Sequence, residues 1–313
     1  MVSGQPHSET SDTLAPRPVS PAYGRYAVAI LMLTYALSFL DRQVVTILAE
    51  PIKNDLKLAD WQLGMMTGMA FALLYTVLGI PIARLAERGH RPFIIATAVM
   101  TWSAFTVLCG QTHNFIQLLL ARAGVGVGEA GGTPPALSLI ADYAPKEKRA
   151  SSVAFYMIGA PLGGLAGMAI GGLVADHWGW RHTFLLIGLP GILVATVIAL
   201  TLREPRSKAM RKLAQEADRE GVLMKDLAAL GKKPAYRWVV TAATARGFET
   251  YGASAFYGSF FLRNHMEALQ QISAPLGLKP LGFLGVTLGL TLGIAGVVGV
   301  TIGGFLTDYG ARK

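Results

Sequence analysis

The sequence predicts an all-α membrane protein, and three observations lead to this fold class. Of the 313 residues, 52% are hydrophobic and only 15% are charged, whereas soluble domains carry about 25% charged residues. The apolar residues gather in runs of about 20, the length that a helix needs to cross a bilayer. Lysine and arginine concentrate in alternate connections between these runs, as they do in multi-pass membrane proteins.

Eight apolar stretches are long enough to span a membrane. The polar, proline-rich residues 1–22 precede them, lack the apolar core of a signal peptide and are expected to form a disordered cytoplasmic tail. The predicted spans lie at residues 26–48, 62–83, 93–111, 115–142, 151–175, 183–202, 238–262 and 283–307.

Basic residues predict the orientation of these spans. Twenty of the 28 lysines and arginines fall in the connections on one side and five on the other. This bias places the N-terminus, the loop 203–237 and the C-terminus in the cytoplasm. The net charge of +9 is therefore a topology signal, and we expect no nucleic-acid partner. Short loops without an N-glycosylation sequon favour a bacterial inner membrane.

The loop 203–237 is predicted to be a cytoplasmic linker that contains an amphipathic helix. Met210, Leu213, Leu223 and Leu227 recur at helical spacing among charged residues, as in helices that lie on a membrane surface. A tether between two halves of the protein explains this loop more simply than a regulatory site.

An internal repeat divides the chain. A shift of 221 positions places Ser38–Gln43 (SFLDRQ) on Ser259–Asn264 (SFFLRN) and aligns further glycines. Residues 23–202 are therefore predicted to form an N-terminal six-helix bundle, and residues 238–313 the first two helices of a truncated second bundle. Two bundles contain twelve spans, so we expect the chain to be the first two thirds of a longer protein. Parallel repeats of this kind build transporters whose substrate site lies between the halves.

Charged residues inside the predicted spans mark the candidate site. The stretch RAGVGVGEAGG, residues 122–132, contains a G-x-G-x-x-G pattern, but apolar helical runs flank it where a dinucleotide-binding loop requires a strand. Arg122 and Glu129 share one helix face and lie about 10 Å apart along its axis. They either pair with each other or pair with another helix, because a charge costs roughly 3 kcal/mol in the membrane and normally faces a partner.

Asp41 in the first span is the expected partner. Apolar residues surround it, and the second copy of the repeat has Leu262 at the matching position. A carboxylate gains or loses a proton according to whether an arginine stays close, so we predict proton coupling at Asp41 and Glu129. Substrate binding is predicted at Arg122, Glu129 and Asp41. A structural ion pair between the first and fourth spans is the alternative, and Arg42, turned about 100° from Asp41, is assigned no function.

Further candidates lie in the first and seventh spans. Tyr35, Phe39 and Tyr251 are expected to contact an amphiphilic substrate, although packing is the commoner role of such aromatic residues. Glu249 either pairs with Arg246 or completes the substrate cavity from the second half.

The sequence also excludes several classes of protein. The single Cys109 rules out a disulfide framework and a cysteine metal site. The histidines lack metal-ligand spacing, and neither a nucleophile–base set nor a phosphate-binding loop is present. We therefore expect no enzyme, no ATP-driven pump, no cofactor and no bound metal.

The connection after the second span resembles a family motif. The major facilitator superfamily carries the pattern G-x-L-x-D-R-x-x-R there, which residues 83–91 (ARLAERGHR) match in part and residues 304–312 match more closely. In the fourth span, Arg122, Gly126 and Gly128 match the family pattern R-x-x-x-G-x-G. The resemblance implies the major facilitator fold, with eight of an expected twelve transmembrane helices present. It also implies a conformational latch made of Glu87, Arg88, Arg91, Asp308 and Arg312.

A narrower resemblance concerns the Spinster branch of lipid transporters. RAGVGVGEAGGTPPALSLIADYAPKEKRA, LDRQ in the first span and WGWRHTFLLIGLPGIL around the sixth are similar to that branch. The resemblance implies that Asp41, Arg122 and Glu129 line the cavity of a secondary transporter. We expect a monomer that moves a lysophospholipid or sphingolipid by alternating access, with protons as the coupling ion. A drug, organic-anion or metabolite transporter of another branch and a non-transporting lipid receptor are the alternatives.

Overall fold

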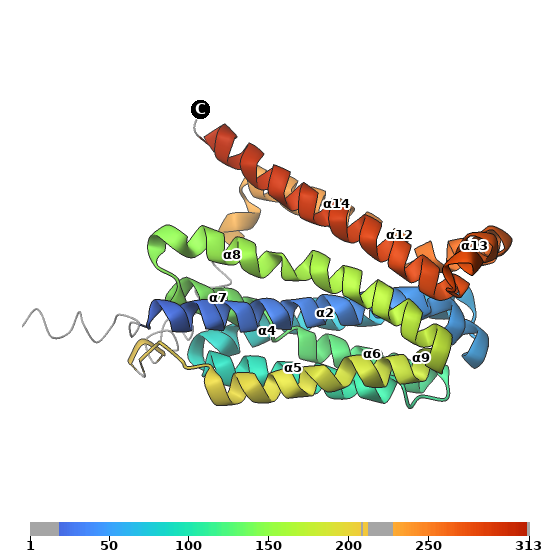
Figure 1. Cartoon of the computed structure of the whole chain (residues 1–313). Coiled ribbons are helices and arrows are strands. Elements are labelled where there is room, and N and C mark those ends of the chain that lie inside the picture. The colour runs from blue at the N-terminus through green and yellow to red at the C-terminus, as the bar shows by residue number, and fades with distance from the viewer. Residues whose placement is uncertain (1–18, 208, 212–227, 312–313) are drawn as a thin grey trace, which may run out of the picture.

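Helices form the whole of the described structure. The computed structural model describes residues 19–207, 209–211 and 228–311, except for the side chains of residues 69–70, 249–251, 300 and 303–311, and no strand occurs in this part. The helices in Figure 1 are α2 (Pro21–Leu56), α3 (Asp60–Gly64), the π-helix η1 (Met65–Met69), α4 (Ala70–Arg88), α5 (Arg91–Cys109), α6 (Phe115–Glu129), α7 (Thr133–Tyr143), η2 (Lys146–Lys148), α8 (Arg149–Met157), α9 (Gly159–Thr201), α12 (Pro234–Asn264), α13 (Met266–Ser273), η3 (Ala274–Leu276) and α14 (Pro280–Ala311). The amphipathic helix predicted in the linker lies mostly outside the described residues.

Each predicted span coincides with one of these helices or with a broken pair of them. By length and composition, five helical stretches among the described residues can cross a membrane: Pro21–Leu56, Asp60–Arg88, Arg91–Cys109, Lys146–Thr201 and Pro280–Gly299.

Glycine and proline decide where two of the spans turn or break. The stretch Lys146–Thr201 contains two predicted spans, because α9 turns at Gly179, whose φ of 81° suits glycine. The predicted fourth span breaks into α6 and α7 just before Pro134 and Pro135, since proline lacks the N–H that a helix interior requires.

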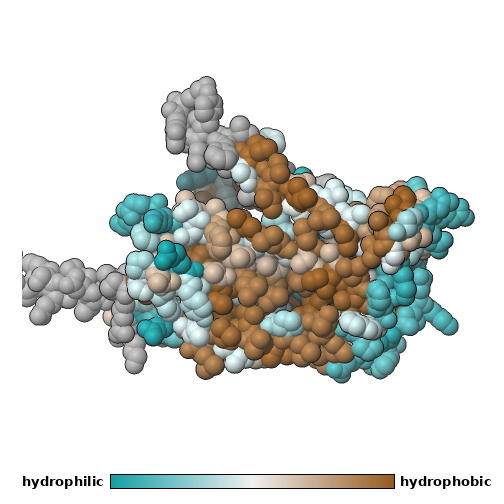
Figure 2. Space-filling model, in the orientation of Figure 1, coloured by the Kyte–Doolittle hydropathy of each residue, from teal (hydrophilic) through white to brown (hydrophobic). Residues whose placement is uncertain are grey.

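Apolar side chains cover the middle of the molecule. Figure 2 shows polar side chains at both ends of the bundle and an apolar belt between them, the pattern of a protein that crosses a bilayer. α2 lies within the bundle and packs most extensively against α9. We call the end at which α2 begins the inner end, after the predicted topology, and the opposite end the outer end.

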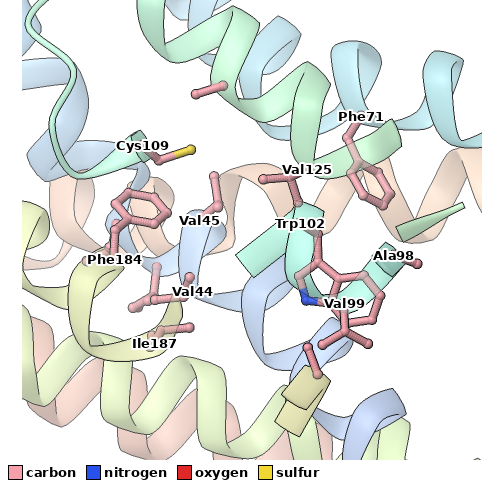
Figure 3. Packing of buried hydrophobic residues seen from close by; sticks show 14 of the residues in the cluster. Val44, Val45, Phe71, Ala98, Val99, Trp102, Cys109, Val125, Phe184 and Ile187 are labelled. Carbon is pink, nitrogen blue, oxygen red and sulfur yellow. The ribbon is translucent and has the colours of Figure 1, made fainter. Parts of the chain in front are cut away.

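Glycines allow the helices of the bundle to approach closely. Gly128 of α6 lies against the backbone of Trp102 in α5, and Gly163 of α9 lies against the backbone of Ala36 in α2. Small residues such as these bring helix backbones together in membrane proteins. Figure 3 shows apolar side chains of α2, α4, α5, α6 and α9 packed together in the resulting core.

The helices α12 and α14 belong to the second copy of the repeat. α14 packs on α9 where Gly285 meets Met168, and α12 packs on α2 where Gly258 meets Thr46. Figure 1 shows α14 close to the bundle near α13 and diverging from α8 toward the C-terminus. The two halves therefore meet at the outer end and separate toward the inner end.

Candidate functional site

Two ion pairs lie inside the bundle, and both link α2 to α6. In the first pair, Arg122 Nη1 lies 3.1 Å from Asp41 Oδ2. Thr106 of α5 donates a hydrogen bond of 2.7 Å to the other oxygen, Asp41 Oδ1. Asp41 and Arg122 expose only 2% and 1% of their surface. Both carboxylate oxygens of Asp41 are therefore hydrogen-bonded inside the protein.

The second pair joins Arg42 to Glu129. Arg42 Nη2 and Nε lie 2.6 and 2.7 Å from Glu129 Oε2, and Ser38 Oγ donates a bond of 2.7 Å to the same oxygen. Glu129 Oε1 is buried and has no hydrogen-bond partner in the part of the chain that the structure describes. A cavity of about 10 Å³ lies beside Glu129 and is lined also by Tyr35 and Tyr156. In the first pair the buried atom without such a partner is Arg122 Nε, and a cavity of similar size lies beside Asp41, so the pairs differ in which member keeps a free atom.

Helix geometry explains why each α2 residue has its own partner. Asp41 and Arg42 are successive residues, so their side chains leave α2 about 100° apart. Arg122 and Glu129 lie about 10 Å apart along α6, and each reaches a different residue of α2. The expected pairing of Asp41 with Arg122 is thus present in the structure, whereas the proposed roles of these residues stay predictions.

Aromatic rings surround the Arg42 guanidinium. Its central carbon lies 5.0 Å from the ring centre of Phe39, 4.7 Å from that of Phe71 and 4.9 Å from that of Tyr75. These are cation–π distances, so the rings hold the arginine independently of its carboxylate. Tyr35 packs edge-on against Phe39 at 4.9 Å. Both aromatic residues predicted from the first span therefore lie near the second ion pair.

The part that the candidates from the seventh span play in this site stays a prediction. Glu249 and Tyr251 lie in α12, but their side chains fall outside the described residues. Phe248 exposes 84% of its surface and faces away from the neighbouring helices. The site as described is built from the first half of the repeat.

The inner end holds a separate charged cluster around Arg91, one of the predicted latch residues. The buried Arg91 guanidinium lies 2.5 Å from Glu204 and 2.7 Å from Asp142. Arg206 lies 3.1 Å from the same Asp142 oxygen. Glu87 is exposed, so Arg91 ties α5 to α7 and to the chain after α9 instead of pairing within its own motif.

The surroundings of Glu204 in this cluster favour its charged form. Burial alone raises the pKa of Glu204, but hydrogen bonds from Arg91 and from the backbone N–H of Arg206 outweigh it, so the pKa lies below its ordinary value. The side chains of Asp308 and Arg312 fall outside the described residues, and Arg88 is half-buried. A latch across the two copies of the motif therefore stays a prediction.

Sequence reasoning misses three polar residues of the site. Ser38 and Arg42 lie one turn apart on one face of α2, a spacing that could have suggested a common partner. Thr106 gives no such signal, because it lies 65 residues from Asp41 in the chain and hydroxyl residues are common in spanning helices.

Charged contacts join the two halves at the outer end. Arg263, near the end of α12, lies 2.8 Å from Glu50 of α2 and 2.8 Å from Asp60 of α3. Asp176 of α9 accepts a hydrogen bond from the backbone N–H of Gly282 in α14. These contacts lie at the end of the bundle opposite to the one toward which α14 diverges (Figure 1).

Comparison with known proteins agrees with this architecture. The chain matches the model of the Major Facilitator Superfamily over residues 31–313. It is 36% identical to a bacterial homologue of the human lysosomal transporter Spinster, whose crystal structure is inward-facing and unoccupied. The two superpose with a TM-score of 0.75 over 93% of this chain and 64% of that one.

Two further relatives are named as an efflux pump and as a hexuronate transporter. The chain is 32% identical to an MFS-type efflux pump of Mycolicibacterium smegmatis over 92% of this chain and 63% of the pump. It is 24% identical to a hexuronate transporter of Bacillus subtilis over 91% of this chain and 65% of that transporter. The chain therefore spans less than two thirds of the length of these relatives.

Proposed function

The chain belongs to the major facilitator superfamily, and we propose that the protein is a proton-coupled transporter of a lysophospholipid or sphingolipid. The resemblance of the sequence to the Spinster branch implies a lipid-like substrate, and the likeness to the bacterial Spinster homologue agrees with that branch. Contacts between the two repeats at the outer end, with α14 diverging toward the inner end, fit alternating access.

The observation that carries the proposal is the pairing of each buried carboxylate with an arginine across the α2–α6 interface. A charge inside the membrane costs roughly 3 kcal/mol, so each pair stays together while both members are charged. Protonation of a carboxylate removes the attraction and releases its arginine. A proton and a negatively charged head group can thus exchange at the same arginine.

The Arg42–Glu129 pair is the one that opens first in this proposal. Glu129 has a free oxygen beside a cavity, and the Arg42 side chain exposes 11% of its surface. After protonation of Glu129, the rings around Arg42 keep the guanidinium in place. It can then bind a phosphate by charge-assisted hydrogen bonds. Release of the proton from Glu129 restores the pair and expels the head group. The Asp41–Arg122 pair then opens and closes in the same way, as Asp41 gains and loses a proton.

In this proposal, the change between an inward-open and an outward-open state depends on the ion pairs of Arg263 with Glu50 and Asp60 at the outer end. These ion pairs connect helices of the two halves, so they hold the outer end closed while the inner end is open. Opening of the outer end requires that they separate. Partly exposed ion pairs contribute only about 0–1 kcal/mol, which makes them suitable for a contact that forms and breaks in every cycle.

An organic anion is the second candidate substrate. Arg42 and Arg122 bind a carboxylate as well as a phosphate, and a hexuronate transporter shares the fold. The three rings around Arg42 favour an amphiphile, because they place apolar surface directly beside the charge. A non-transporting lipid receptor would bind the same substrate without moving it.

Flux measurements on the full-length protein in proteoliposomes separate these functions. We expect saturable uptake of radiolabelled lysophosphatidylcholine that depends on a pH gradient and is inhibited by a phosphorylated sphingoid base, which also carries a phosphate on a single chain. Inhibition by glucuronate with no lysolipid uptake would favour the organic-anion transporter. Lysolipid binding without flux, with or without the gradient, would favour the receptor.

A further inference from the structure

A groove of about 580 Å³ lies at the inner end, between the start of α2, the end of α7 and the start of α8. Val28 and Ala29 of α2 and Phe155 of α8 provide apolar lining. Arg25 and Lys148 lie at its rim together with the hydroxyl of Ser152. The groove is separate from the two ion pairs, and its size suits part of an amphiphile.

The two cations of this groove differ from other basic residues at the inner end. Arg91 and Arg206 each form ion pairs with acidic side chains. The side chains of Arg25 and Lys148 are both exposed and form no hydrogen bond or ion pair with any residue that the structure describes. Their charge is therefore available to an anion in the groove.

Packing between helices limits the depth of the groove. The apolar lining on α2 extends from Pro21 to Ala29, a rise of about 12 Å. Beyond it, Gly159 brings α9 against the backbone of Met32 and closes the space between the helices. The groove therefore holds a head group and the first part of a chain. Phe155, which is 42% exposed, lies where the rest of the chain would leave.

Charge and polarity together identify the ligand class. Two unpaired cations attract an anion, whereas the apolar lining contributes nothing to the binding of free phosphate. We propose that this groove binds the anionic head group and proximal chain of a single-chain amphiphile. On the proposed transport function, it is a docking site for the substrate at the inner end, separate from the central site.

Binding to the purified full-length protein in detergent micelles tests this site. The probe is oleoyl-lysophosphatidic acid, with monoolein as its neutral counterpart and glycerol 3-phosphate as its head group alone. In the double variant Arg25→Gln/Lys148→Gln, we expect the Kd for lysophosphatidic acid to rise about tenfold, since two charge-assisted contacts are lost. The Kd for monoolein should stay unchanged, and glycerol 3-phosphate should not compete.

A matched control removes two charges elsewhere at the same end. Lys232 and Lys233 are exposed and precede α12, so Lys232→Gln/Lys233→Gln should leave the Kd for lysophosphatidic acid within twofold of wild type. A photoreactive derivative of the probe should label residues 21–29 and 143–155. Equal weakening in both double variants, wild-type binding in Arg25→Gln/Lys148→Gln, or full competition by glycerol 3-phosphate would each overturn the site.

The same experiments separate this inference from the proposed function. Absence of proton-driven flux, with the expected binding pattern intact, overturns the docking role in transport and leaves the binding site standing. Lysolipid flux with wild-type binding in Arg25→Gln/Lys148→Gln overturns the site and leaves the transport function standing.

Discussion

The two ion pairs between α2 and α6 differ in how their carboxylates are hydrogen-bonded, although their α2 members are successive residues. Asp41 uses both oxygens, one for Arg122 and one for Thr106. Glu129 receives all its hydrogen bonds on one oxygen and keeps the other free among the described residues. Each pair keeps one buried atom without a partner among the described residues, Arg122 Nε in the first and Glu129 Oε1 in the second, so Glu129 is the carboxylate with an oxygen free to accept a proton first.

Replacing Arg122 or Arg42 by leucine should reduce the stability of the folded protein more than the other changes below. It also tests the difference between the two ion pairs most directly. Loss of one partner from a buried pair costs about 3–5 kcal/mol, so we expect this destabilisation for Arg122→Leu. Arg42→Leu should cost less, because its side chain is partly exposed and Glu129 keeps the bond from Ser38. Thermal unfolding in detergent measures both. Equal losses would show that the two pairs do the same structural work.

The difference between the pairs also marks the limit of the sequence-based predictions. Asp41, Arg122 and Glu129 stand out in the sequence because isolated charges in apolar runs are costly. Arg42 is also charged, but its partner depends on how α2 is rotated against α6. Hydrophobic periodicity does not specify that rotation.

The same reasoning applies to the fold. The eight spans follow from length and hydropathy, and the break before Pro134 follows from the backbone chemistry of proline. The π-helix at Met65–Met69 has no such local signal. The pairing of Arg91 with Glu204 joins residues 113 positions apart, so only the assembled bundle brings them together.

Removing the hydroxyl group that donates to each carboxylate tests the same difference between the two ion pairs, and it should reduce the stability by a smaller amount. Thr106→Val keeps the side-chain shape but removes the only hydrogen bond to Asp41 Oδ1, which should cost about 1.5–3 kcal/mol. Ser38→Ala should cost about 1 kcal/mol, because Arg42 still donates two bonds to Glu129 Oε2. Unfolding of the two variants under identical conditions gives the ranking, and a larger loss for Ser38→Ala would contradict it.

Lowering the pH should reduce the stability that Glu204 gives to the inner-end cluster, and this is the smallest of the expected effects. The pKa of Glu204 is lowered in the folded protein, so its stabilisation is present above its unfolded pKa and disappears as the pH falls through the folded value. Glu204→Gln should therefore be less stable than wild type by about 1–2 kcal/mol at pH 7. The two proteins should converge in acid. A gap that stays constant between pH 7 and pH 3 would mean that the charge of Glu204 contributes nothing.

The central claim is that a proton on Glu129 exchanges with substrate at Arg42. The most direct test compares two transport modes of Glu129→Gln in the full-length protein in proteoliposomes, because a permanently neutral side chain blocks only the steps that move a proton. We predict that Glu129→Gln still exchanges labelled for unlabelled lysolipid across the membrane but no longer accumulates it in response to a pH gradient. Gradient-driven accumulation at the wild-type level in Glu129→Gln would contradict the account.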